Sequence, residues 1–201
     1  MQMPRLTSLI AVVWFAAFLS TANAQYNVKN MIEEGRSCLA TGEYLVSMHL
    51  LNRIAILKPY LYEPWYLMAQ AKYHLEDYDG SIHDSSKAIE LNPYIPEMLD
   101  LRAMSYIQKE RYDSAAVDYT RAIELSPDNS NYWFNRAWCY DRANQRELSR
   151  SQLEYIIRRW PSLSQAKQLL HELNGGKKRS LTTRQQVLST RRLISKTQLK
   201  P

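Results

Sequence analysis

The chain has 201 residues, which is room for one ordinary domain or for a short array of repeats. Its hydrophobic content of 45% suits a chain that folds, and five glycines are too few for a loop-rich fold. The formal charge of +6 is unevenly spread: residues 175–201 hold eight basic and no acidic residues, so residues 1–174, with 18 basic and 20 acidic residues, carry a net charge of −2.

Residues 1–24 are predicted to be a secretory signal. A basic start precedes an unbroken apolar run at 9–19, and Ala22 and Ala24 then form an A-x-A pattern that predicts cleavage before Gln25. An uncleaved anchor is the less favoured alternative, because a bilayer span needs roughly 20 apolar residues. We therefore expect an exported protein, in the periplasm, the cell envelope or the medium. The mature chain has no N-x-S/T acceptor, which fits a bacterial envelope protein.

Four prolines spaced 34 residues apart set the frame of the central chain: Pro59, Pro93, Pro127 and Pro161. They define units at about 28–61, 62–95, 96–129 and 130–161. In the third unit Leu99, Ala103 and Tyr106 lie at i, i+4 and i+7, which places them on one helical face, and the same spacing recurs after a short turn. Proline then ends the second helix because it has no N–H to donate. Each unit is predicted to contain two helices and a turn.

The pattern resembles the tetratricopeptide repeat, a 34-residue unit with small and aromatic residues at fixed positions. The matching residues are Gly35, Tyr44, Ser47, Leu51 and Pro59 in the first unit; Trp65, Ala69, Tyr78, Ser81, Ala88 and Pro93 in the second; Leu99, Ala103, Tyr106, Tyr112, Ala115, Tyr119, Ala122 and Pro127 in the third; and Trp133, Ala137, Tyr140, Ser149, Leu153 and Pro161 in the fourth. The fourth unit departs at Arg146, in place of an aromatic, and at Ile156, in place of a small residue. The resemblance covers about residues 26–161. It implies an all-α, right-handed superhelical solenoid of four helix-turn-helix repeats.

A further helix is predicted after the last repeat, at residues 162–174. Four apolar residues lie on one face of it (Ala166, Leu169, Leu170 and Leu173), and Lys167, Gln168 and Glu172 point away. We interpret it as a capping helix, because the end of a repeat stack needs cover. The repeats and this helix together make one predicted domain, residues 25–174.

The sequence has no motif for catalysis, a cofactor or a metal. The four histidines (His49, His74, His83 and His171) are scattered over different helices without metal-ligand spacing. Cys38 and Cys139 lie three repeats apart, farther than a disulfide can reach, and are expected to be packing residues. We therefore expect a protein that is not an enzyme.

The resemblance implies that a partner binds in a concave groove lined by the first helix of each unit. The candidate groove residues are Arg36, Tyr66, Gln70, Tyr73, His74, Met104, Ile107, Phe134, Asn135, Trp138 and Arg142. Asp100 and Leu101 lie on the same predicted face. A chaperone C-terminal carboxylate is not the expected ligand, because Arg36 is the one basic residue at the family's carboxylate-binding positions and Glu97 would repel the ligand. The expected function is a non-catalytic scaffold or adaptor that binds a peptide or a protein segment.

Residues 175–201 form a basic and, by prediction, disordered tail. Its candidate contact residues are Lys177, Lys178, Arg179, Arg191 and Arg192. The tail has no aromatic residue on which a base could stack, so nucleic-acid binding is not favoured. The alternative function is therefore a surface-association protein whose tail binds an anionic membrane or an acidic partner.

Overall fold

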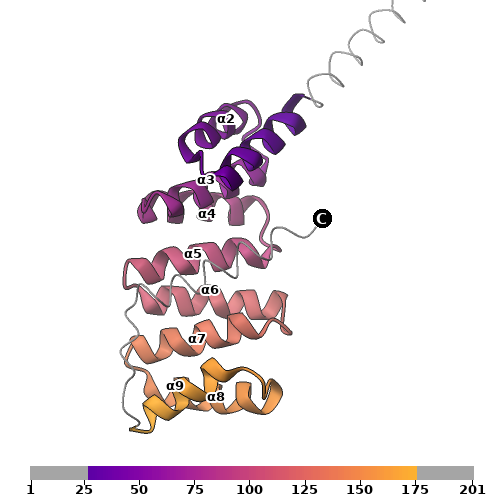
Figure 1. Ribbon diagram of the computed structural model, residues 1–201. Helices are drawn as coiled ribbons and strands as arrows, with labels where there is room; N and C mark the ends of the chain where they lie inside the picture. Colours follow the sequence, from indigo (N-terminus) through magenta and orange to yellow (C-terminus); the bar gives the residue numbers. More distant parts are fainter. Residues whose placement is uncertain (1–26, 176–201) are drawn as a thin grey trace, which may run out of the picture. The chain divides into compact units, whose positions relative to one another are not determined.

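The computed structural model describes residues 27–175, which are all-α (Figure 1). Residues 27–41 are helical. The helices that follow are α2 (Tyr44–Leu57), α3 (Tyr62–His74), α4 (Tyr78–Leu91), α5 (Pro96–Gln108), α6 (Tyr112–Leu125), α7 (Ser130–Arg142), α8 (Arg146–Arg159) and α9 (Ser164–Leu173). The predicted leader (1–24) and the predicted tail contacts at 177–192 lie outside the described residues. The predicted all-α repeat fold is confirmed.

The helices follow the 34-residue frame set by the prolines. The first helices α3, α5 and α7 begin at Tyr62, Pro96 and Ser130, the first residues of the predicted units. Each second helix from α2 to α8 ends two residues before one of the four prolines. A proline at that place cannot continue the helix, so the same sequence position ends every repeat.

The turn inside each repeat contains one residue in the left-handed conformation. These residues are Gly42, Glu76, Glu110 and Asn144, with φ of 86°, 65°, 57° and 61°. After the left-handed residue, a backbone N–H returns to a carbonyl of the first helix, as in Asp77 N to Lys72 O at 2.9 Å and Arg111 N to Tyr106 O at 2.8 Å. Such a turn satisfies carbonyls that the end of a helix leaves unpaired.

Small residues allow the two helices of a repeat to approach closely. Ala69, Ala103 and Ala137 are fully buried, and a Cβ added at Gly35 would lie 2.9 Å from two side-chain carbons of Leu51. The hydroxyl of a serine on the second helix also bonds across the gap, as in Ser149 Oγ to Ala137 O at 2.8 Å. The fold therefore uses these positions as the sequence pattern predicts.

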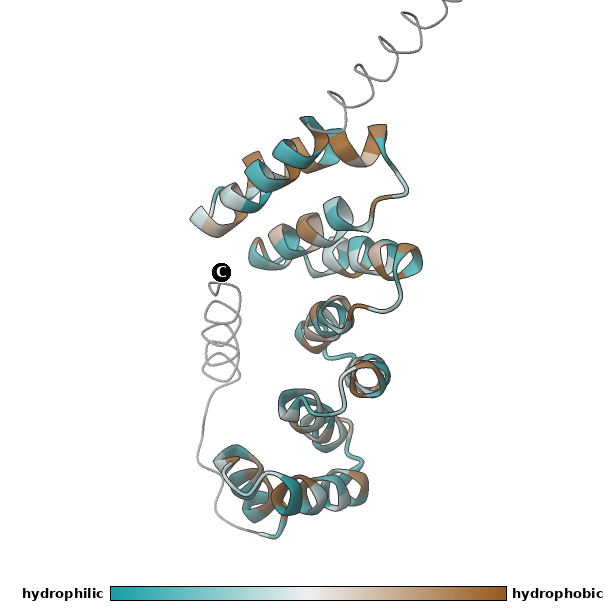
Figure 2. Ribbon diagram, turned by 90° about the vertical axis from the view of Figure 1, so that its right-hand side faces the viewer, coloured by the Kyte–Doolittle hydropathy of each residue, from teal (hydrophilic) through white to brown (hydrophobic). Residues whose placement is uncertain are grey.

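The chain divides into two compact units, residues 1–152 and 153–201, with the boundary inside α8. In the first unit each helix from α2 to α7 contacts the next, and buried side chains between them form the core. Hydrophobic and hydrophilic residues alternate along the helices, as amphipathic packing requires (Figure 2). None of the described helices is long and apolar enough to cross a membrane.

The described part of the second unit ends with the predicted additional helix, α9. Ala166 and Leu169 are buried in it while Lys167 and Gln168 are exposed, as predicted, whereas Leu170, Glu172 and Leu173 are all half-buried. The helix ends at Leu173, and Gly175 follows with a positive φ of 93°. In the same unit, Ile156 is fully buried although the repeat pattern has a small residue at its position.

Candidate binding face

The first helices of the repeats lie side by side in the first unit. Besides the contacts between successive helices, α3 also contacts α5. Residues at equivalent positions are therefore expected to line one surface, which we call the first-helix face: the side chains of helix 27–41, α3, α5 and α7 that point away from the second helices. Tyr66, Asp100 and Phe134 share one such position, 34 residues apart, and all three are half-buried.

The candidate groove residues differ widely in exposure. Three are buried (Gln70, Tyr73 and Met104), five are half-buried (Tyr66, Ile107, Phe134, Asn135 and Trp138), and three are exposed (Arg36, His74 and Arg142). Leu101, on the same predicted face, is buried as part of the core. Half-buried rings and the exposed groups at their edges are the part of this surface that a partner could contact.

Two of the candidates pack locally at the end of α3. The His74 ring stacks on Tyr44 of α2, with centroids 4.9 Å apart and planes 7° apart. Tyr73 makes edge contacts with His74 and with Tyr78 of α4. These rings therefore help to hold the first and second repeats together.

Arg36 is also engaged within the protein. Its guanidinium lies 3.0 Å from the carboxylate of Glu63 on α3 and 3.6 Å from that of Glu33. Two acidic partners offset its charge.

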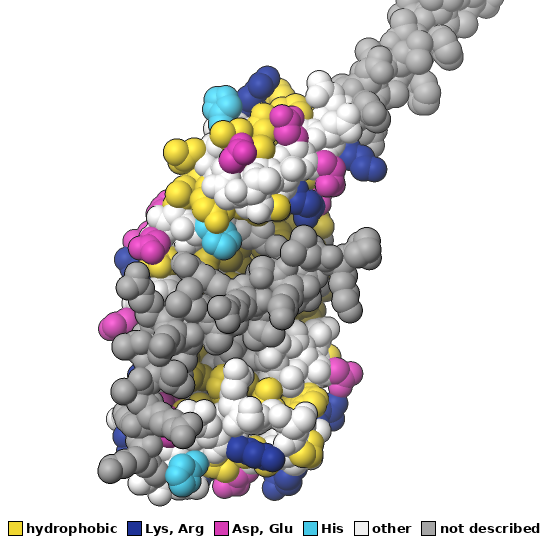
Figure 3. Space-filling model, in the orientation of Figure 1, with side chains coloured by type: hydrophobic (Ala, Val, Ile, Leu, Met, Phe, Trp, Pro, Cys, Tyr) yellow, Lys and Arg dark blue, Asp and Glu magenta, His cyan; other side chains and the backbone are white. Residues whose placement is uncertain are grey.

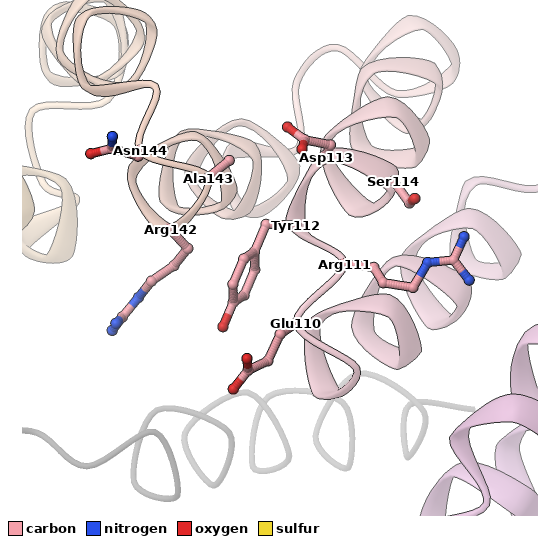
Figure 4. Close-up of a pocket in the computed structure, with 8 residues that line it drawn as sticks. All are labelled: Glu110, Arg111, Tyr112, Asp113, Ser114, Arg142, Ala143 and Asn144. Atoms are coloured by element: carbon pink, nitrogen blue, oxygen red, sulfur yellow. The ribbon is translucent and has the colours of Figure 1, made fainter.

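Arg142 and Tyr112 line a shallow pocket of about 400 Å³ at the turns of the third and fourth repeats. In the close-up, the side chains of Glu110, Tyr112 and Arg142 point to the same side, while Arg111 points away (Figure 4). The guanidinium of Arg142 lies 4.9 Å from the centre of the Trp138 ring, which in turn meets Tyr112 edge-on at 5.8 Å. The pocket is open, and its aromatic residue, Tyr112, packs against Trp138 of the next repeat.

The centre of the first-helix face holds a polar network around Asp100. The Tyr119 hydroxyl, which comes from α6, donates to the Asp100 carboxylate. Asn135 Nδ2 of α7 donates to that same hydroxyl oxygen at 3.3 Å. The second carboxylate oxygen of Asp100, Oδ1, is buried and has no hydrogen-bond partner among the described residues. A buried carboxylate oxygen without a hydrogen-bond partner is energetically costly.

The surroundings of Asp100 are uncharged or negative. Burial raises the pKa of Asp100 to about 6; the hydrogen bond from Tyr119 opposes this shift, and the charge of Glu97 adds to it. Burial also raises the pKa of Tyr66, Tyr119 and Tyr132, with a further contribution in each case from the charge of Asp100. Side chains of α3, α5, α6 and α7 thus face one carboxyl group.

Sequence reasoning placed Asp100 on the right face but did not make it a candidate. The sequence could have identified Asp100, because it lies 34 residues from both Tyr66 and Phe134, and these two equivalent residues were candidates. Tyr119 was assigned to packing because the family pattern has a ring there. The structure shows that its fully buried ring also brings a hydroxyl to Asp100.

No group of histidine, cysteine, aspartate or glutamate side chains within residues 27–175 could hold a metal ion. Cys38 and Cys139 are free thiols. Cys139 is fully buried in α7, and this burial raises the pKa of its thiol, which leaves the sulfur protonated and inert at neutral pH. The expectation that it is a packing residue therefore agrees with its position.

The stack of helix-turn-helix units defines the chain as a repeat solenoid of the all-α class. Sequence profiles of the tetratricopeptide repeat match residues 62–94, 96–129 and 118–152. The chain belongs to the tetratricopeptide repeat family.

Solved structures share this fold at low sequence identity. MamA (residues 41 to the end) from Desulfovibrio magneticus RS-1 is 19% identical, with a TM-score of 0.67 over 73% of this chain and 83% of that one. YrrB, described as a tetratricopeptide protein with an unusual peptide-binding site, is 14% identical, with a TM-score of 0.64 over 75% and 79%. The first tetratricopeptide domain of Spaghetti (RPAP3), bound to the HSP90 peptide SRMEEVD, is 18% identical, with a TM-score of 0.51 over 55% and 88%. At these identities the likeness shows the fold alone. No curated protein sequence matches the chain significantly.

Proposed function

We propose that the protein is a non-catalytic interaction module that binds a segment of a partner protein on its first-helix face. The observation that carries this proposal is the half-burial of Tyr66, Ile107 and Phe134, apolar side chains from three successive repeats. Neighbouring residues of the same helices, such as Leu67 and Ala137, are fully buried. Tyr66 and Ile107 pack against the core with part of their surface and leave the rest exposed. Large apolar side chains left at a surface are typical anchors for a partner.

The fold comparisons support the same proposal. YrrB is described as having a peptide-binding site, and the Spaghetti domain was solved with a peptide bound. A repeat surface built from parallel first helices offers a row of equivalent positions, which suits an extended or helical segment.

Selection of ligands from a random dodecapeptide display library on the full chain tests the proposal. The dissociation constants of the selected peptides are then measured for the wild type, for Phe134→Ala and for Val117→Ala. Val117 is the matched control, since it is an exposed apolar residue (69% accessible) on the second helix α6. We expect Phe134→Ala to weaken binding about tenfold, the loss of one buried aromatic anchor, and Val117→Ala to leave it unchanged. Equal effects of the two substitutions, or a library without binders, would reject the proposal.

The proposed compartment is outside the cytosol. The leader pattern at residues 1–24 supports this, and the test is the mass of the protein recovered from expressing bacterial cells. Export predicts a chain that begins at Gln25, whereas recovery of the intact chain from the cytosolic fraction alone contradicts it.

A further inference from the structure

We propose that Asp100 is a recognition site for a positively charged side chain, lysine or arginine, on the segment that binds the first-helix face. The proposal rests on the proposed function and specifies its ligand. The network around Asp100 lacks a positively charged hydrogen-bond donor, and a lysine or arginine side chain would supply one.

The first step is the unmet hydrogen bond. Tyr119 supplies one donor to the Asp100 carboxylate, while Asp100 Oδ1 has no donor among the described residues. An ammonium or guanidinium group provides donors that suit a carboxylate oxygen, and a charge-assisted bond of this kind is stronger than one between neutral groups. Asp100 Oδ1 therefore has unused bonding capacity, which a cationic group of a ligand would fill.

The second step is the sign of the local charge. Glu97, on the same helix, adds negative charge, and the groups contributed by the other helices (Tyr66, Tyr119 and Tyr132) are neutral hydroxyls. No described basic residue is among the groups that shift the pKa of Asp100. The arrangement differs from that of Asp118, an acid that lies deeper and whose carboxylate pairs with Arg102 at 2.6 Å. The fold pairs one acid internally and leaves the other for a ligand.

The third step is access. Asp100 shares its repeat position with the half-buried Tyr66 and Phe134, so a chain lying along the first-helix face passes over all three. Rings on both sides of a carboxylate suit a basic side chain, because its aliphatic stem packs on apolar surface while its charged end reaches the acid. The expected ligand is thus a segment with apolar residues on either side of a lysine or arginine.

The test uses the random dodecapeptide library on the full chain, on Asp100→Asn and on Asp79→Asn. Asp79→Asn removes the same charge from an exposed acid of α4 and is the matched control. We expect lysine or arginine at one fixed position of the peptides selected by the wild type and by Asp79→Asn, and no such preference for Asp100→Asn. Replacing that basic residue by norleucine or citrulline should weaken binding to the wild type about tenfold and leave binding to Asp100→Asn nearly unchanged.

The pH dependence gives a second readout. A cation requires ionised Asp100, so wild-type affinity should fall about tenfold between pH 7.5 and pH 5, since the pKa of Asp100 is about 6 before the ligand binds. Asp100→Asn should lose this dependence. An affinity that is flat with pH would overturn the proposal.

Residues 177–192 of the chain itself also contain lysine and arginine side chains. A further variant therefore replaces Lys177, Lys178, Arg179, Arg191 and Arg192 by glutamine. Tighter peptide binding by this variant, with the basic preference retained, supports the Asp100 site and identifies the tail as a competing source of cations; unchanged binding leaves the partner as the source. Apolar peptides selected without a basic residue would overturn the Asp100 site while the proposed function stands. Binding that is insensitive to Phe134→Ala would instead overturn the proposed function.

Discussion

Arg102 of α5 and Asp118 of α6 form a two-point ion pair, with Nε to Oδ2 at 2.8 Å and Nη2 to Oδ1 at 2.6 Å. The same guanidinium donates to Ser86 of α4 in the preceding repeat at 3.0 Å. One repeat length later along the chain, Arg136 donates one hydrogen bond to Gln152 and one to Thr120, each at 3.0 Å. An arginine of the first helix thus joins its own second helix to that of the repeat before it.

We predict that Asp118→Ala destabilises the protein by about 2–4 kcal/mol, because it leaves a half-buried arginine without its partner. Chemical denaturation followed by circular dichroism measures the change. The control is Asp79→Ala, which removes an exposed acid paired with Lys109 at 2.8 Å and should cost less than about 1 kcal/mol. Equal costs for the two substitutions would show that the buried pair has no special role.

The left-handed turns give a second prediction. Glu76 has φ of 65° and an exposed side chain, whereas glycine occupies the equivalent position 42. Glu76→Gly should raise the free energy of unfolding by about 0.5–1 kcal/mol, since glycine adopts this conformation without steric cost. Gly42→Ala should lower it by a similar amount, and purely through the backbone, because no atom lies within 4 Å of the added Cβ. Destabilisation by Glu76→Gly would show that the glutamate side chain matters more than the backbone strain.

The close approach at Gly35 gives a third prediction. An added methyl group would lie 2.9 Å from Cγ and Cδ2 of Leu51, which is fully buried. We expect Gly35→Ala to destabilise the protein by about 1 kcal/mol or more, since the overlap outweighs the better helix propensity of alanine. Leu51→Val should reduce the penalty of Gly35→Ala in a double-mutant cycle measured by thermal unfolding. Additive effects would mean that the two side chains do not meet.

Asp100 is predicted to cost stability at neutral pH. Its folded-state pKa of about 6 lies above the ordinary value of 3.8, so the folded state holds the proton more tightly than the unfolded state does. Its contribution is therefore most favourable below pH 4 and is lost as pH rises through 6. Asp100→Asn should stabilise the free protein by about 1–2 kcal/mol at pH 7.5, and the difference should shrink below pH 5. If Asp100→Asn destabilised the protein at pH 7.5, this result would contradict the conclusion that Asp100 Oδ1 has no hydrogen-bond partner.

The repeat frame was predictable from sequence because it depends on local chemistry at a fixed period. Pro93 and Pro127 end helices for reasons that need no tertiary structure, and Ala103 must be small wherever two helices touch. The network around Asp100 was not predictable in this way. It depends on the Tyr119 hydroxyl reaching from the second helix to the first-helix face, and a sequence pattern reports that a ring is present but not where its hydroxyl ends.

The exposure of the candidate residues also needed the structure. Gln70 and Met104 share one repeat position with Trp138, yet the first two are buried and the third is half-buried. The repeat period gives the position of each residue but not how far its neighbours cover it; Trp138, for example, meets Tyr112 edge-on. Hydrophobic side chains are also visible on the first repeat in Figure 3, on α2, where Leu45 and Ile56 are more than 70% exposed. The candidate set based on first helices did not include them.

Photocrosslinking shows directly whether ligands bind the first-helix face. A benzophenone amino acid replaces Tyr66 or Phe134 on the first-helix face. The control positions are Val117, on the second helix α6, and Tyr94, in the loop after α4, which are 69% and 77% exposed. Each variant is irradiated with a peptide selected on the wild type, and the crosslinked fraction is measured by mass spectrometry. We predict crosslinks from positions 66 and 134 and none above background from 117 and 94. Crosslinks mainly from 117 or 94 would contradict it.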